Sequence, residues 1–393
     1  MSTIRITDSV DWIGVFDPDL RVFDIIMETK RGTSYNSYLV RGEKTAIIEA
    51  VKAPFAQEYL DNVRSLIDPA SIDYIILNHM EPDHTGALAT LLESAPQAKV
   101  VVSKTGEQYV NNIVNRELNP LKMDDGDTID LGGKTLRFVF APFLHWPDTM
   151  FTYLVEEGVL FPCDVFGCHF YDPRLFNDLV DDFNGEFEYY FQTIMRPFKE
   201  KMRDALAKIK GFDIKIIAPS HGPVLRKDPW SYYERYVQWA TEPLDGKRAV
   251  IAFVSAYGNT RSLAEAIAEG LRESGVMVNL VDLAAKDLNM SLLTDMVEQA
   301  QALLVGSPTI NGDAVAPVWR FLASLATIRL RGKIGGAFGS YGWSGEATKM
   351  IEDRLSSLRL KVPVEAVRAK LVPSAAELEK ARQFGRQIAA EIQ

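Results

Sequence analysis

The apolar residues of the first part of the chain come in short runs separated by turn residues. Runs over residues 10–16, 22–27, 37–40 and 45–51 predict antiparallel strands joined by hairpins. Phe55, Tyr59 and Val63 recur at helical spacing after Pro54, so a helix is expected there. Further strands are expected at residues 74–77, 99–103, 134–140, 150–154, 159–161 and 214–217, and further helices at 86–92, 106–114, 197–209 and 230–240. This mixture predicts an α+β domain.

The pattern changes after a linker-like stretch at residues 241–247. Strands are now expected at 248–254, 302–306 and 333–340, and helices at the stretch carrying Leu263, Ile267 and Leu271, ending near Gly275, and at 375–392. Regular alternation of strand and helix predicts a doubly wound parallel sheet, an α/β fold covered on both faces. We therefore predict two domains, residues 1–245 and 248–393.

Composition limits the class of protein. The 393 residues are 47% hydrophobic and 24% charged, as in soluble globular proteins, and no apolar run is long enough to cross a bilayer. The start of the sequence lacks a secretory signal, and the two cysteines, Cys163 and Cys168, do not form a C-x-x-C motif. A cytoplasmic protein is expected. The net charge of −10 without a dense Lys/Arg block argues against nucleic-acid binding.

Four potential metal ligands lie within six residues: His79, Glu81, Asp83 and His84. They follow the apolar run 74–77 and precede the expected helix, so their side chains can converge at a strand-to-helix turn. A single buried His or Asp is more often structural than a ligand, but two imidazoles and two carboxylates at this spacing indicate a metal site able to serve two ions.

Three further candidates follow later strands: His145, Asp164 and His221. Each alone is as easily structural as functional, yet four of the five histidines in the chain follow apolar strands. Strand ends are where open sheets gather functional side chains. The fifth histidine, His169, is expected to line the pocket without binding metal. The aromatic residues between 186 and 198 are expected to belong to the core.

The first strand-to-helix loop of the second domain favours phosphate binding. It consists of Ser255, Ala256, Tyr257, Gly258, Asn259 and Thr260. Its hydroxyls and backbone N–H groups, with the following helix N-terminus, can wrap a terminal phosphate. The loop is neither a triphosphate P-loop nor G-x-G-x-x-G.

Two later loops also follow strand ends, where doubly wound sheets bind ligands. The first contains Ser307, Pro308, Thr309, Ile310 and Asn311, and the second contains Ser340, Tyr341, Gly342, Trp343, Ser344, Gly345 and Glu346. Small residues there let backbone groups approach a planar ring, on which Tyr341 or Trp343 can stack.

The H-x-E-x-D-H order of residues 79–84 resembles the H-x-H-x-D-H motif of the metallo-β-lactamase superfamily, with Glu81 replacing the second histidine. A carboxylate in this place shifts preference from zinc towards iron or manganese, and within that superfamily it looks like the flavodiiron proteins. The 255–260 loop looks like the phosphate loop of flavodoxins, which bind FMN. The resemblance covers the whole chain.

The resemblance implies an N-terminal αββα metallo-β-lactamase-like domain with two iron ions and a flavodoxin-like FMN domain. It implies that one iron binds His79, Glu81, His145 and Asp164, and that the other binds Asp83, His84, Asp164 and His221. Asp164 then bridges the two. It further implies that Tyr190 approaches the diiron pocket.

The implied function is that of an oxidoreductase. Electrons would pass from a small redox carrier such as rubredoxin through FMN to the irons, which reduce O2 to water, NO to N2O, or both, with O2 favoured. The sequence leaves no room for an appended rubredoxin, so a separate donor is expected, and a head-to-tail homodimer or dimer of dimers would bring flavin and iron together. The alternatives are a dinuclear zinc hydrolase with an attached binding module and an electron carrier with a relic metal domain. Glu81 argues against the zinc hydrolase.

Overall fold

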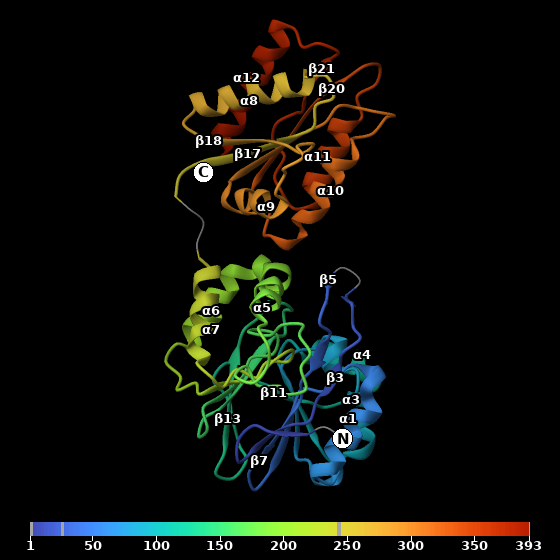
Figure 1. Ribbon diagram of the computed structural model, residues 1–393, viewed down its shortest axis with the longest axis vertical. Helices are drawn as coiled ribbons and strands as arrows, with labels where there is room; N and C mark the ends of the chain where they lie inside the picture. Colours follow the sequence, from blue (N-terminus) through green and yellow to red (C-terminus); the bar gives the residue numbers. More distant parts are fainter. Residues whose placement is uncertain (1–2, 25–26, 242–244, 393) are drawn as a thin grey trace. The chain divides into compact units, whose positions relative to one another are not determined.

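The computed structural model describes residues 3–24, 27–241 and 245–392 and divides the chain into two units, Met1–Thr241 and Glu242–Gln393. Each unit has its own sheets, helices and core (Figure 1). The strands of unit 1 are β1 Ile4–Arg5, β2 Val10–Trp12, β3 Val15–Asp17, β4 Val22–Phe23, β5 Met27–Glu28, β6 Thr33–Tyr35, β7 Tyr38–Arg41, β8 Thr45–Ile48, β9 Tyr74–Leu77, β10 Lys99–Ser103, β11 Leu121–Met123, β12 Thr128–Asp130, β13 Thr135–Phe140, β14 Met150–Leu154, β15 Val159–Phe161 and β16 Ile216–Ile217. Its α-helices are α1 Ala56–Leu66, α2 Pro82–Thr85, α3 Leu88–Ser94, α4 Glu107–Val114, α5 Asn184–Tyr190, α6 Lys199–Ile209 and α7 Pro229–Trp239.

Unit 1 is a sandwich of two sheets with helices on its outer faces, as predicted. One sheet has the order β1-β2-β7-β8-β9-β10-β11 and the other the order β12-β13-β14-β15-β16. Strand β9 explains the layering, because successive side chains of a strand point to opposite faces. Ile76 joins the core between the sheets, whereas Ile75 and Leu77 join the core shared with the helices. In Figure 1, α1, α3 and α4 lie along one flank and α6 and α7 along the other.

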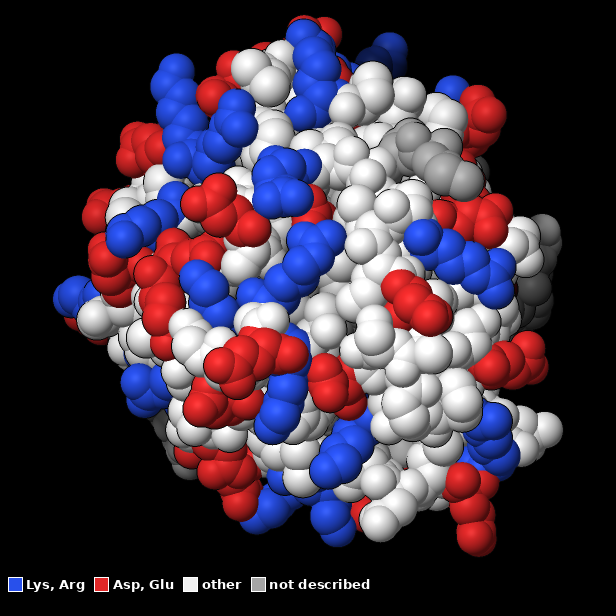
Figure 2. Space-filling model, turned by 90° about the horizontal axis from the view of Figure 1, so that it is seen from below, with Lys and Arg blue, Asp and Glu red and all other residues white. Residues whose placement is uncertain are grey.

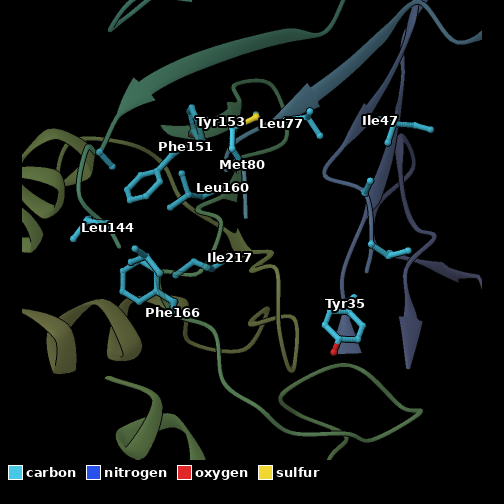
Figure 3. Packing of buried hydrophobic residues seen from close by; sticks show 14 of the residues in the cluster. Tyr35, Ile47, Leu77, Met80, Leu144, Phe151, Tyr153, Leu160, Phe166 and Ile217 are labelled. Carbon is cyan, nitrogen blue, oxygen red and sulfur yellow. The ribbon is translucent and has the colours of Figure 1, made fainter. Parts of the chain in front are cut away.

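The second sheet packs on its outer face in the same way. Figure 3 shows Phe151 and Leu160, from neighbouring strands β14 and β15, with Leu144 and Phe166 close to them. These side chains are fully buried, so the loops that carry Leu144 and Phe166 pack firmly against the outer face of the second sheet.

Two predicted strands near the N-terminus are wrong. The run 10–16 is broken at Gly14, where a Cβ atom would lie 2.2 Å from the Tyr35 carbonyl oxygen, and its halves β2 and β3 join different sheets. The run 22–27 is not one strand, because β4 and β5 pair with each other as an antiparallel hairpin. Residues 25–26 of that prediction lie outside the described residues.

Unit 2 is a parallel sheet covered on both faces, as predicted. Its strands are β17 Arg248–Phe253, β18 Met277–Asp282, β19 Ala302–Gly306, β20 Ile334–Tyr341 and β21 Val367–Lys370, and its helices are α8 Asn259–Glu273, α9 Met290–Gln299, α10 Ala316–Ser324, α11 Ala347–Ser357 and α12 Ala375–Glu391. The sheet order β18-β17-β19-β20-β21 is the flavodoxin-like order 2-1-3-4-5. Leu263 of α8 and Phe384 of α12 pack on one face, whereas Val318 of α10 and Ile351 of α11 pack on the other.

The helices and surface add two observations. Within residues 3–24, 27–241 and 245–392, no helix has both the length and the apolar character to cross a bilayer. On the face shown in Figure 2, the Lys and Arg side chains are interspersed with Asp and Glu side chains, so this face carries charges of both signs.

Candidate metal centre and flavin loops

The candidate metal ligands come together at one end of the two sheets of unit 1. His79 and Glu81 follow β9, and Asp83 and His84 lie in the short helix α2 that begins at Pro82. The other three follow strands of the second sheet: His145 lies between β13 and β14, Asp164 follows β15, and His221 follows β16. Six of the seven side chains are buried or nearly so, and His145 is 20% exposed.

One carboxylate oxygen of Asp164 belongs to a first group of ligand atoms. Asp164 Oδ2 lies 3.6 Å from His79 Nε2 and 3.5 Å from His145 Nε2. Glu81 Oε2 lies 3.1 Å and 2.9 Å from the same two nitrogens. Two imidazoles and one carboxylate therefore face one point beside Asp164 Oδ2.

The other oxygen of Asp164 belongs to a second group. Asp164 Oδ1 lies 3.2 Å from His84 Nε2 and 3.3 Å from His221 Nε2. Asp83 completes the group, with Oδ1 at 3.4 Å from His84 Nε2 and Oδ2 at 3.1 Å from His221 Nε2. The structure thus arranges the seven residues as two sets of two histidines and one carboxylate, with Asp164 between them.

These atoms fit a pair of metal ions. Ligands bound at about 2.1 Å to one ion lie about 3 Å apart, which matches the separations within each set. Both oxygens of Asp83, Asp164 Oδ2 and His84 Nε2 are buried and make no hydrogen bond among the described residues, although such groups in proteins normally have a partner. Two histidines and one carboxylate are the ligand set typical of non-haem iron.

The pKa values of the histidines in the metal-free site also favour bound cations. Burial lowers the pKa of His145, but the Asp164 and Glu81 carboxylates outweigh it and raise that pKa to about 10. Burial also lowers the pKa of His221, whereas Asp164 and Asp83 raise it to about 9. Protons on the imidazoles thus provide the positive charge that metal ions would otherwise bring to the carboxylates.

A second layer of groups orients the histidines. His221 Nδ1 donates a hydrogen bond of 2.8 Å to the Ser34 carbonyl oxygen, so in the neutral ring Nε2 carries the free lone pair. His84 Nδ1 lies 3.4 Å from Glu49 Oε2, and His79 Nδ1 lies 3.7 Å from Asp148 Oδ2.

Sequence reasoning missed these three orienting groups. Asp148 stands three residues after His145, and Glu49 stands at the end of the predicted strand 45–51. These two positions, close to a ligand and to a strand end, were the only hint in the sequence. Their spacing did not show which histidine either carboxylate would contact.

Tyr190 and His169 lie beside the two sets. The Tyr190 hydroxyl donates to Asp164 Oδ1 at 3.1 Å, and a π-helix, Phe191–Met195, begins directly after it. The His169 ring centroid lies 5.2 Å from that of His221, and its Nδ1 lies 2.9 Å from Thr33 Oγ1. Burial, with the neighbouring His221 next, lowers the pKa of His169 to about 3. No nitrogen of His169 belongs to either ligand set.

The three predicted flavin loops follow β17, β19 and β20, which are neighbours in the sheet of unit 2. Thr260 Oγ1 and Ser340 Oγ are buried and 2.8 Å apart, which joins the first loop to the third. Thr309 N donates to Ser340 O at 2.9 Å, which joins the second to the third. The loops 255–260, 307–311 and 340–346 therefore meet at the carboxyl end of the sheet.

The shape of these loops fits a phosphate and a planar ring. Gly258 has a φ of 85°, a left-handed conformation that favours glycine, directly before α8 begins at Asn259. In the first turn of α8, Arg261 N donates to Ser255 Oγ at 3.2 Å, and the N–H groups before Arg261 can face an anion. Tyr257 and Trp343 are 92% and 83% exposed, so their rings are open to stack on a ligand.

Comparison with known proteins decides the family. A model described as ODP family beta lactamase matches residues 33–222, and a flavodoxin model matches residues 251–385. A type A flavoprotein of Rhodobacter capsulatus is 46% identical over 98% of this chain and 91% of the relative. A flavo-diiron protein of Clostridium acetobutylicum is 41% identical over 100% of both chains. This chain belongs to the flavodiiron protein family.

Solved structures agree. The rubredoxin oxygen:oxidoreductase of Desulfovibrio gigas has a TM-score of 0.71 and 31% identity to this flavodiiron protein, covering 100% of this chain and 98% of its own. Other relatives are named nitric oxide reductases. The cofactors of this flavodiiron protein are FMN in the flavodoxin-like unit and two non-haem irons in the lactamase-like unit.

Proposed function

We propose that this flavodiiron protein reduces O2 to water, NO to N2O, or both, at a diiron centre in unit 1. The observation that carries the proposal is the pair of ligand sets that share Asp164. The proposed ligands are His79, Glu81 and His145 for one iron, Asp83, His84 and His221 for the other, and Asp164 for both.

The protein's own residues give the site its rigidity. When bound, the irons supply a redox-active pair that takes up the gas, and FMN supplies electrons to them. The Ser34 carbonyl oxygen holds His221 Nδ1 by a hydrogen bond, and the Glu49 and Asp148 carboxylates lie near the outer nitrogens of His84 and His79, which favours inner nitrogens aimed at the metals. The Tyr190 hydroxyl offers a hydrogen-bond donor beside Asp164.

We propose that the loops 255–260, 307–311 and 340–346 bind FMN, within a second domain of residues 248–393. The buried contact of Thr260 with Ser340 and the position of the 255–260 loop at the α8 N-terminus support this assignment. The FMN phosphate would lie at the 255–260 loop and the flavin ring near Tyr257 and Trp343.

The electron donor is proposed to be a separate small carrier of the rubredoxin kind, in the cytoplasm. The name of the Desulfovibrio gigas relative supports rubredoxin, and the two free, buried thiols of Cys163 and Cys168 suit a reducing compartment. Stopped-flow mixing with reduced rubredoxin should bleach the FMN absorbance rapidly. A flavin that stays oxidised with rubredoxin but accepts electrons from dithionite would point to another donor.

We further propose a head-to-tail homodimer, alone or as a dimer of dimers, in which the flavin of one subunit faces the diiron centre of the other. Exposed apolar side chains beside the flavin loops support this, since a second copy would bury them. Leu371 and Val372 are 60% and 75% exposed, and Leu371 N donates to Tyr341 O at 2.8 Å, within the third flavin loop.

Metal and gas measurements test the function. Protein purified without added metal should contain about two irons and one FMN per chain, and its reduced form should consume O2 or NO. Stoichiometric zinc with hydrolytic activity would favour the dinuclear hydrolase and overturn the proposal. Loaded protein that consumes neither gas would favour an electron carrier.

A further inference from the structure

A cavity of about 350 Å³ lies against His169 and Tyr190, the two side chains beside the candidate metal centre. Its lining residues are Glu28, Lys30, His169, Gly185, Glu186, Tyr189 and Tyr190. His169 and Tyr190 are buried at its inner end, whereas the Glu28 and Lys30 side chains are 72% and 80% exposed. The cavity therefore runs from solvent to within one side chain of Asp164, because Tyr190 bonds to that carboxylate.

The inner end contains a polar atom without a partner. His169 Nε2 is buried and makes no hydrogen bond among the described residues, while Nδ1 of the same ring is held by Thr33. Buried polar atoms in proteins normally bond to a protein group or to ordered water. A water molecule needs roughly 10–15 Å³ of such space, so the cavity holds several of them.

The chemistry of the proposed function requires protons to enter the site and water molecules to leave it. Reduction of one O2 molecule to two water molecules takes up four protons with four electrons, and reduction of two NO molecules to N2O takes up two protons with two electrons and releases one water molecule. Five of the seven proposed ligands are buried and Glu81 is only 12% exposed, so these protons and water molecules must cross a packed shell.

We propose that this cavity is the water-filled passage by which the diiron centre takes up protons and releases water, and that His169 is the positioning residue for its innermost water. The inference rests on the proposed function. The charged mouth, formed by Glu28, Lys30 and Glu186, suits water and protons better than an apolar gas.

Gly185 allows the passage to be closed without disturbing the fold. A Cβ atom built there meets no atom within 4 Å, and the residue lines the cavity at the exposed start of α5. Gly211 offers a matched control, since a Cβ atom there also meets nothing within 4 Å and Gly211 does not line the cavity. Gly185→Trp should fill the passage, Gly185→Ala should leave it open, and Gly211→Trp should change nothing.

Kinetics of the iron- and FMN-loaded proteins give the first test. Gly185→Trp should lower kcat for gas reduction about tenfold or more, a part of the roughly 10²–10⁴-fold that positioned proton transfer contributes, and enlarge its solvent deuterium isotope effect. The rate of flavin reduction and the KM for the gas should stay at wild-type values. Unchanged kcat would overturn the proposal. A raised KM with an unchanged isotope effect would instead identify a passage for the gas. Slower flavin reduction would identify a surface for electron transfer.

A crystal structure of the loaded protein gives a test independent of activity. We expect an ordered water molecule within hydrogen-bond distance of His169 Nε2, followed by others towards Gly185, and their loss in Gly185→Trp. A dry cavity would overturn the passage even if the protein reduces O2 or NO. Loaded wild-type protein that reduces neither gas would overturn the proposed function, while the water positions would still decide the passage.

Discussion

Asp164 is the residue on which both halves of the candidate metal centre depend. Each of its oxygens faces two histidine nitrogens, and burial alone would raise its pKa. The surrounding imidazoles instead hold the pKa of Asp164 well below its usual range, so this carboxylate stays ionised. A permanent negative charge between two sets of imidazoles favours cations at both positions.

The first prediction concerns protons released on metal binding. In the metal-free protein, the pKa values of His145 and His221 are raised to about 10 and about 9, so both rings are charged at pH 7. Metals bind neutral imidazole, and loading must therefore expel at least these two protons. Affinity should rise with pH from 7 towards 9, because fewer protons then need to leave. Calorimetry of ferrous-ion binding in two buffers with different protonation enthalpies measures the number of protons released. Release of fewer than two protons would contradict the prediction.

The second prediction concerns Glu49. Its carboxylate lies 3.4 Å from His84 Nδ1, and Glu49→Gln removes the charge while keeping the shape. Loss of such an orienting partner weakens metal binding by about 10–100-fold. Equilibrium titration with iron under anaerobic conditions should show one weakened site per chain. Glu43→Gln, at an exposed position of the same unit, is the control and should bind both irons normally. Equal affinity in the two variants would mean that Glu49 is structural only.

The sequence predicted the residues at strand ends and missed those that contact them. His79, His145, Asp164 and His221 were recognisable because each directly follows an apolar run, whose carboxyl end the sheet brings to a common edge. Glu49 and Asp148 are acidic residues like many others in the chain. Only the packed turns of the folded unit bring them to His84 and His79, and single-sequence patterns carry no information on such contacts.

Elements bounded by clear apolar runs were predicted well, even the short strands β9 and β15, whereas β18, α9, α10 and α11 were not predicted. Strand β10 and helix α12 match their expected residues closely, because an unbroken run of three valines marks the strand and the helix is 17 residues long. Strands β4 and β5 have two residues each, too few for any periodicity. The π-helix after Tyr190 was also invisible, since one widened turn leaves the aromatic pattern unchanged.

The third prediction concerns the contact between α8 and α12. The helices approach at two glycines: a Cβ atom at Gly270 would lie 2.0 Å from Arg382 O, and one at Gly385 would lie 2.3 Å from Ile267 O. Gly270→Ala must push the helices apart, which costs about 1–3 kcal/mol. Urea unfolding followed by FMN fluorescence should show an earlier midpoint. Glu265→Ala, on the exposed face of α8, should stay within about 0.5 kcal/mol of wild type.

At the scale of the whole molecule, each proposed site lies within one unit. The fourth prediction is that residues 248–393 alone bind FMN and residues 1–245 alone bind iron, because every proposed ligand of each cofactor is present in its fragment. Visible absorbance of the purified fragments after reconstitution with FMN or iron measures the binding of each cofactor. A folded 248–393 fragment that stays colourless with excess FMN would count against the flavin loops.

The fifth prediction concerns transfer between chains. One partner carries His79→Ala with Asp164→Ala, which removes the metal centre, and the other carries Ser255→Asp with Thr260→Asp, which repels the FMN phosphate. Each homodimer should be nearly inactive. A purified mixed dimer keeps one FMN facing one diiron centre in the head-to-tail arrangement, and it should recover about half of the wild-type gas consumption per dimer. A correctly loaded mixed dimer as inactive as its parents would refute transfer between chains.

The spread of the proposed ligands along the sequence, from His79 to His221, has a consequence for how the protein is made. Residues 79–84 leave the ribosome long before His221, on the order of ten seconds earlier at about 5–20 residues per second. Until β16 is synthesised and paired with β15, the nascent chain offers an incomplete ligand set. Unit 2 is synthesised later still, so the proposed iron ligands of each new chain are all made before the proposed flavin loops.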